Sequence, residues 1–190
     1  MRIYRPSLIS PTRAGFGSQD DILVRLTAFM IEHGLAVNAL NQLSLLPADL
    51  IADHIVGLMG LPTDDTGGGH IYNMTADDYY NLTDIMRVLS ERHGYRFAYH
   101  DIPSFVEQAN RRCAPRDPLY PLVDFLTRSA DKIAAMRNKR YDNTQYRHAR
   151  SLAKVRLHEP ALAETVDNLV RFLRSEGLIN ENQTEKRRIA

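Results

Sequence analysis

The chain of 190 residues has no tryptophan and a single cysteine, Cys113. One cysteine excludes an internal disulfide framework and any metal site built from several thiolates. The apolar stretches fall well short of the ~20 residues that a membrane-spanning helix needs. The amino-terminal residues also lack the long apolar core of a signal peptide. We therefore expect a cytoplasmic protein with no membrane partner.

An excess of charge of one sign is also missing. The formal net charge is +1, from 24 Lys and Arg against 23 Asp and Glu. A balanced charge gives no overall field that would attract a polyanion, so we expect no nucleic-acid partner. The apolar share of 44% and the charged share of 25% are typical of a globular domain. Composition alone therefore leaves open a generic α/β domain of no stated function.

Several catalytic patterns are absent. No lysine stands four residues after any tyrosine, so no Tyr-x-x-x-Lys pair shares one helix face. An arginine at that spacing is a poor substitute, because the guanidinium is always charged and differently shaped. The seven histidines are dispersed and show no His-Glu-x-x-His spacing, so we expect no metal site. Cys113 adjoins Arg112, but the sequence suggests no catalytic partner, and we interpret it as an inert thiol.

The only glycine-rich run is at residues 67–69. A phosphate-binding loop follows a strand and precedes a helix, so that backbone amides point at the anion. Here the run follows a predicted helix and precedes a predicted strand. We therefore interpret residues 67–69 as a linker.

Hydrophobic periodicity predicts a helix-rich α/β chain. Short apolar or alternating runs predict strands at residues 2–5, 43–46, 70–74 and 96–100. Helical spacing predicts helices that begin near residues 20, 47, 81, 103, 118 and 160, with a polar loop at 132–145. The first three strands need further strands beside them, because alone they would expose edge amides. We therefore expect a partner or an oligomer at an exposed sheet edge, or a domain rebuilt from the carboxyl-terminal helices.

Five short motifs occur in a recognisable order, at residues 4–10, 46–52, 70–73, 117–122 and 164–178. Together they resemble the terminal thioester reductase domains of nonribosomal peptide synthetases and polyketide synthases, which carboxylic acid reductases also carry. These domains belong to the extended short-chain dehydrogenase/reductase superfamily. The family more often has glycine at the positions that Ser7 and Pro11 occupy here. The tryptophan that is usual in the family is absent, and Phe105 stands near its place. The glycine-rich cofactor turn and the catalytic Tyr and Lys of the family have no counterpart in these motifs.

The resemblance implies a fold and a division of the chain. The fold is the carboxyl-terminal portion of a Rossmann-like extended reductase, with a mostly helical substrate subdomain. Residues 1–66 are then residual elements of the nucleotide-binding domain. Residues 67–178 are the substrate-binding subdomain, and residues 179–190 are a flexible tail.

The resemblance also implies an activity. The enzyme would use NADPH, bound mainly by an amino-terminal half, to release a carrier-bound acyl or peptidyl thioester as an aldehyde or an alcohol. This chain would supply the substrate-binding portion, would carry no catalytic residue, and would be inactive alone. The positions implied to contact the cofactor are Pro6, Ser7 and Leu8. The positions implied to line the substrate channel are Phe105, Leu119, Leu122, Phe125 and Leu126.

A basic segment at residues 137–141 has two interpretations. It is either a solvated loop or a patch that meets an acyl or peptidyl carrier protein and its phosphopantetheine arm, because Lys and Arg bind phosphate well. The docking interpretation assigns Arg137, Lys139 and Arg140 to that contact. A second functional hypothesis remains beside the reductase one, namely a non-catalytic module that docks a carrier protein or another partner.

Overall fold

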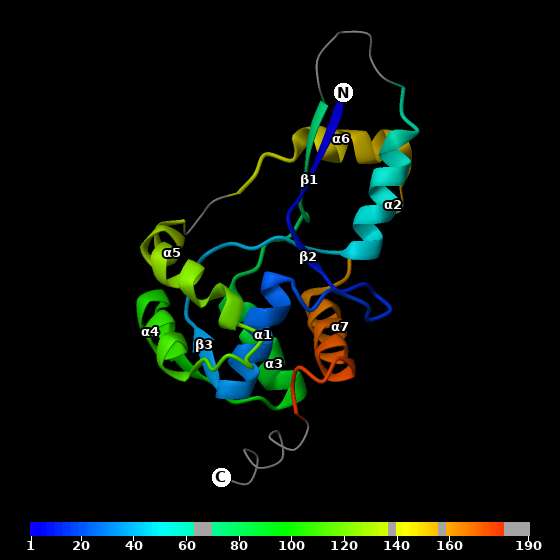
Figure 1. Cartoon of the computed structure of the whole chain (residues 1–190). Coiled ribbons are helices and arrows are strands. Elements are labelled where there is room, and N and C mark those ends of the chain that lie inside the picture. Colours follow the sequence, from blue (N-terminus) through cyan, green and yellow to red (C-terminus); the bar gives the residue numbers. More distant parts are fainter. Residues whose placement is uncertain (63–69, 137–139, 156–158, 181–190) are drawn as a thin grey trace.

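The computed structural model describes residues 1–62, 70–136, 140–155 and 159–180. These residues form short parallel strand pairs surrounded by helices (Figure 1). The strands are β1 (Arg2–Pro6), β2 (Leu8–Ser10), β3 (Leu35–Val37), β4 (Leu45–Pro47), β5 (His70–Met74) and β6 (Ala98–His100). The α-helices are α1 (Ile22–His33), α2 (Ala48–Met59), α3 (Leu82–His93), α4 (Ile102–Arg112), α5 (Val123–Ala135), α6 (Thr144–Ala153) and α7 (Leu162–Ser175).

The strands pair as β1 with β5, β2 with β4 and β3 with β6, and every pair is parallel. The predicted strands at 2–5 and 70–74 are confirmed, and the one at 96–100 is confirmed in its last three residues. The strand predicted at 43–46 begins later, at Leu45, because Leu43 forms an isolated antiparallel bridge with Tyr80 instead. The sequence analysis missed β3, whose three residues are too few to show an alternating pattern.

One edge of β1 faces away from its partner. The carbonyl of Met1 and the N–H of Ser7 take part in hydrogen bonds to β5. Alternate residues of a strand bond to the same neighbour, so the backbone groups of Arg2 and Tyr4 point to the opposite edge. No described strand pairs with β1 there. Pro6 has no N–H, so it limits any further ladder on this edge.

The buried side chains form two clusters. The larger joins α1, α3, α4, α5, α7 and β3, and includes an edge-to-face contact between Phe29 and Phe105 with ring centroids 6.3 Å apart. The smaller is built by α2, β4, β5 and α6, with Leu50, Met74 and Tyr146 at its centre. Figure 1 shows β1, α2 and α6 together at the top and the other helices below. The predicted boundary at residue 66 stays a prediction, and α6 packs with elements from both sides of it.

Local capping signals explain several helix ends. Asn81 and Asp84 form the predicted capping box of α3, in which each side chain bonds the other residue's N–H. Gly34 ends α1 with φ 64°, a conformation that glycine adopts without steric cost. The helix predicted to begin near residue 20 is capped by Asp21, because its carboxylate accepts from the N–H groups of Leu23 and Val24.

Two predictions about the later helices are wrong. Asp117 does not begin a helix. Its side chain accepts the N–H of Ala114, and a 3₁₀ turn at Tyr120–Leu122 precedes α5. Residues 132–145 are also not wholly a loop, since α5 continues to Ala135 and α6 begins at Thr144.

Gly57 lies where α2 approaches the end of α6. A larger residue at this position is expected to clash with its neighbours. A Cβ at Gly57 would lie 2.5 Å from Val155 Cγ2. We expect Gly57→Ala to lower the free energy of unfolding by about 1 kcal/mol, because overpacking outweighs the ~1 kcal/mol gain in helix propensity. Gly60→Ala is the matched control, because its φ is −74° and the nearest atom is 3.5 Å away. It should stabilise by about 0.5 kcal/mol. Urea denaturation that finds the two variants equally stable would contradict this packing.

Candidate functional site

A polar cavity of about 560 Å³ lies at the carboxyl ends of β1 and β5. Its wall includes the predicted cofactor contacts Pro6, Ser7 and Leu8, which continue from β1 into β2. Ligands of α/β proteins bind at this end of parallel strands, where the loops meet. The other polar side chains on its wall are Arg5, Gln42, Ser44, Asn73, Thr75, Tyr79 and Tyr141.

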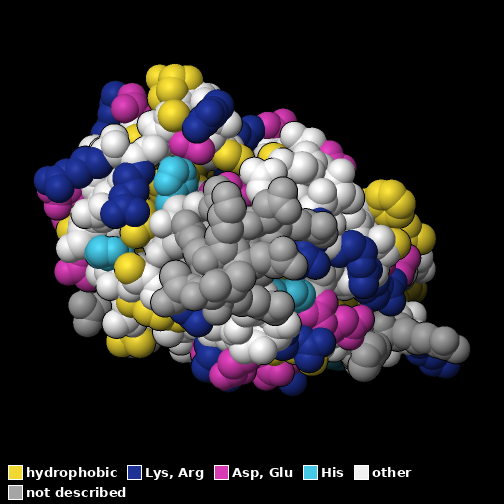
Figure 2. Space-filling view, turned by 90° about the horizontal axis from the view of Figure 1, so that it is seen from below, with side chains coloured by type: hydrophobic (Ala, Val, Ile, Leu, Met, Phe, Trp, Pro, Cys, Tyr) yellow, Lys and Arg dark blue, Asp and Glu magenta, His cyan; other side chains and the backbone are white. Residues whose placement is uncertain are grey.

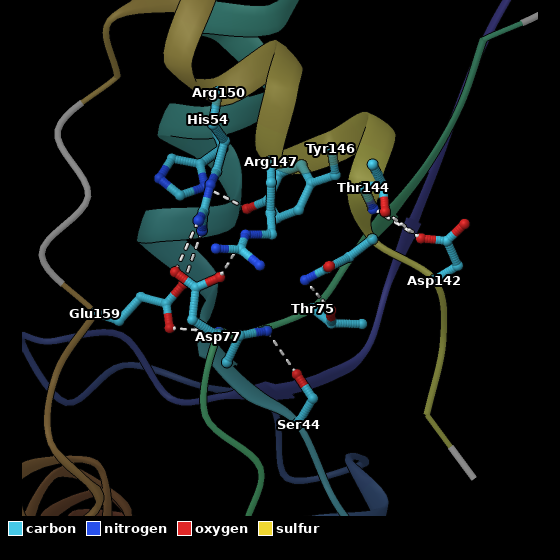
Figure 3. Close-up of polar contacts among 12 residues, drawn as sticks. Ser44, His54, Thr75, Asp77, Asp142, Thr144, Tyr146, Arg147, Arg150 and Glu159 are labelled. Carbon is cyan, nitrogen blue, oxygen red and sulfur yellow. Dashed lines mark hydrogen bonds and ion pairs between the residues drawn. The ribbon is translucent and has the colours of Figure 1, made fainter.

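Hydrogen bonds hold the floor of this cavity. The hydroxyls of Ser7 and Ser44 lie 3.0 Å apart, and Ser44 Oγ also accepts the N–H of Ala76 at 2.7 Å. Asn143 Nδ2 donates to Thr75 Oγ1 at 2.9 Å (Figure 3). Loops that follow β3, β5 and α5 are therefore fixed to one another around a polar surface.

An apolar cavity of about 290 Å³ adjoins the polar one. The two share Gln42, Leu43 and Tyr141 on their walls. Beyond these three residues the wall comes from α1, β3, α3, α4 and α5, which belong to the larger buried cluster, and from Ala39, Asn41 and Met136 outside these elements. The surface thus changes from polar to apolar over a few residues.

The structure brings together some of the predicted substrate-channel residues and separates others. Phe105 and Leu126 line the apolar cavity. Leu119 is completely buried in the core, Leu122 packs against it, and Phe125 is 51% exposed on the outer side of α5. These three do not line the cavity.

Most residues that line the apolar cavity were not among the predicted channel positions. Leu26 and Ile133 are two examples. Ile133 lies in the segment predicted as a loop at 132–145. The signal for Ile133 was its spacing of seven residues from Leu126, which places both on one face of α5.

The predicted docking residues Arg137 and Lys139 lie outside the described residues. Arg140 is described, and its guanidinium lies 4.9 Å above the ring of Tyr79 while Nε donates to Gln42 Oε1. Arg140 therefore stands beside the polar cavity. Figure 2 shows basic and acidic side chains interspersed on the face seen from below, in keeping with the net charge of +1.

A buried arginine organises the region behind the polar cavity. Arg150 of α6 has only 3% of its side chain exposed. It donates to Asp77 at 2.9 Å and to Glu159 at 2.8 Å (Figure 3). Glu159 also accepts the N–H of Asp77 at 2.9 Å. Two acidic groups far apart in the sequence are thus joined to α6.

Tyr146 and Arg150 have the spacing of a Tyr-x-x-x-Lys pair, but their setting is structural. The Tyr146 hydroxyl hydrogen-bonds to His54 inside the smaller cluster. Burial raises the pKa of Tyr146 to about 12, whereas a proton donor at neutral pH benefits from a pKa closer to 7. The pair is therefore unsuited to acid catalysis.

Cys113 also matches its interpretation as an inert thiol. Burial, and then the charge of Asp117, raises the pKa of Cys113 to about 11, so the thiolate that acts as a nucleophile is scarce at neutral pH.

Across the described ranges, no cluster of three or more His, Cys, Asp and Glu side chains could hold a metal. Within the same ranges, no helix combines the length and the apolar character that crossing a bilayer demands.

The Arg150 cluster yields a stability prediction. Arg150→Met removes the shared partner of two carboxylates, and we expect it to lower the free energy of unfolding by about 3 kcal/mol. Arg147→Met is the control, because Arg147 also contacts Asp77 but is 63% exposed. It should change stability by less than about 0.5 kcal/mol. Chemical denaturation of both variants measures this difference. Similar losses for the two would show that the buried cluster contributes no more than a surface pair.

Comparisons with known proteins support the fold. No family model matches the sequence, and a search of curated proteins finds no match. The structure is similar to the terminal R domain of the myxalamid PKS-NRPS pathway, with a TM-score of 0.78 and 18% identity over 94% of this chain and 45% of that chain. The reductase (R) domain of a nonribosomal peptide synthetase from Mycobacterium tuberculosis gives a TM-score of 0.66 and 19% identity over 94% and 46% of the two chains.

A third similar structure is the NADPH-dependent quinone oxidoreductase QOR2 from Escherichia coli, complexed with NADPH. Its TM-score is 0.53 at 18% identity, over 89% of this chain and 65% of that chain. The chain spans less than half the length of the two R domains that it matches. The predicted fold is confirmed: the chain is a helix-rich α/β structure that matches part of the Rossmann-like fold of thioester reductase domains.

Proposed function

We propose that this chain is the substrate-side part of a nicotinamide-dependent thioester reductase. The observation that carries the proposal is a polar cavity at the carboxyl ends of parallel strands that adjoins an apolar cavity, in a fold that matches R domains. A thioester substrate has the same two parts, a polar reacting carbonyl and an acyl group.

The residues on the polar cavity suit the nicotinamide end of NADPH. Ser7, Gln42 and Thr75 offer hydroxyl and amide groups that match a carboxamide, and the volume of about 560 Å³ is that of a ligand pocket. When bound, the cofactor would supply the hydride that reduces the thioester carbonyl to an aldehyde as the C–S bond breaks and the carrier's thiol leaves, and a second hydride would give the alcohol. The chain contributes position and electrostatics. The hydroxyls of Ser7 and Ser44 bond to each other, so both are held in place beside the reacting carbonyl of the substrate. Pro6 and Leu8 limit the access of water to that carbonyl.

The fusion of this chain to a nucleotide-binding half tests the proposal. We would replace the matching part of the myxalamid-pathway R domain with this chain and follow NADPH oxidation with a carrier-bound acyl thioester. We expect turnover, and we expect Ser7→Trp to reduce it more than tenfold because the indole fills the polar cavity. A folded fusion without turnover contradicts the proposal. NADPH binding by the chain alone would argue against the alternative of a pure docking module.

The basic side chain at the cavity supports contact with a carrier protein. Arg140 is exposed and adjoins the polar cavity through Gln42, where the phosphate of a phosphopantetheine arm would pass. Arg137 and Lys139 belong to the same proposed contact. This part of the proposal predicts that docking weakens with salt.

Arg140→Gln should weaken binding of a phosphopantetheinylated carrier protein about fivefold, which corresponds to ~1 kcal/mol. Arg128→Gln is the control, because Arg128 is 81% exposed on α5 and pairs only with Asp124 among the described residues. Calorimetric titration at low and high salt measures both. Equal binding by the two variants at low salt would remove Arg140 from the docking surface.

A further inference from the structure

We infer that the apolar cavity is a compartment of limited length for an aliphatic acyl chain, and that it disfavours a peptidyl chain. The inference rests on the proposed function for the thioester itself and deepens it by naming the class of acyl group. Three observations support it: the apolar side chains of the cavity wall, the hydrogen bonds that its polar side chains already make, and the volume of the cavity.

The wall is apolar and is formed by elements of the larger cluster. Leu26 comes from α1, Val37 from β3, Val106 from α4, and Leu126 and Ile133 from α5. Leu26 and Ile133 remain only partly buried although their neighbours are core residues. Covering such exposed apolar surface with an apolar ligand removes it from water, and this lowers the free energy of the complex.

Each of the two amide side chains on this wall already uses one polar atom in a contact with the protein. Asn41 Nδ2 donates to the carbonyl of Ile133 at 2.6 Å, and Gln42 Oε1 accepts from Arg140. A peptide amide placed in this compartment would give up its hydrogen bonds to water for few replacements. Each such amide lowers affinity roughly tenfold. A hydrocarbon chain makes no hydrogen bonds to water, so it has none to lose on entering the compartment.

The volume sets the length. The cavity of about 290 Å³ equals about ten water molecules at their share of ~30 Å³ each, and a methylene group is similar in size. Gln42, Leu43 and Tyr141 mark the end that adjoins the polar cavity. An acyl chain that enters there can bury about ten carbons, which is the number that the volume accommodates.

Titration of the full chain with acyl-N-acetylcysteamine thioesters tests this inference. Affinity should rise about fourfold with each methylene from butyryl to roughly decanoyl and then stay level. An alanyl-alanyl thioester of similar length should bind at least tenfold more weakly than octanoyl. A continued rise to hexadecanoyl, or no dependence on length, would overturn the inference. Equal affinity for the dipeptidyl thioester would also do so.

Variants locate the compartment. Leu26→Trp should fill it and move the plateau to shorter chains. Leu152→Trp is the control, because Leu152 is an exposed leucine on α6 outside the cavity. If Leu26→Trp does not fold, Met136→Trp serves instead, because Met136 lines the cavity and is 49% exposed. A folded variant with an unchanged plateau contradicts the assignment.

The two proposals fail in different ways. A fusion enzyme that shows no turnover, while the chain still binds thioesters with a length limit, would remove the reductase function and keep the acyl compartment. A fusion that reduces short, long and peptidyl thioesters equally well would keep the function and remove the compartment.

Discussion

The buried guanidinium of Arg150 is the constraint on which the arrangement of the site depends. A charge removed from water must be paired, and Arg150 is paired with Asp77 and Glu159. One partner follows β5 and the other precedes α7, so this cluster fixes α6 against both. Asn143, immediately before α6, then reaches Thr75 at the edge of the polar cavity. The contact of Asn143 with Thr75 on the polar wall thus lies next to a helix that the buried charges of Arg150, Asp77 and Glu159 hold in place.

Each of the two buried clusters supports one of the two cavities. The smaller one positions β1 and β5, whose ends form the polar cavity. The larger one supplies the apolar cavity from its own partly open face. The boundary runs through Gln42 and Leu43, which are adjacent in the sequence and differ in polarity. A ligand with a polar reactive end and an apolar remainder matches this boundary, whereas a uniformly polar ligand does not.

Local signals in the sequence predicted most of the helices and strands, because a cap or a turn depends on a few neighbouring residues. The capping box at Asn81 and the left-handed Gly34 are examples. The site was less predictable, because its side chains are placed by long-range packing. From the sequence alone, Arg150 belongs with the basic residues that follow residue 137, whereas its burial depends on acids that lie 73 and 9 residues away. For the same reason Leu119 and Phe125 were placed in the channel, while Ile133 was not.

The open edge of β1 has a geometric consequence. A neighbouring strand can form hydrogen bonds with the backbone groups of Arg2 and Tyr4, but Pro6 offers it no amide. A parallel strand added there would lack one hydrogen bond at Pro6, which also lines the polar cavity. The segment that followed such a strand would then pass near the cavity.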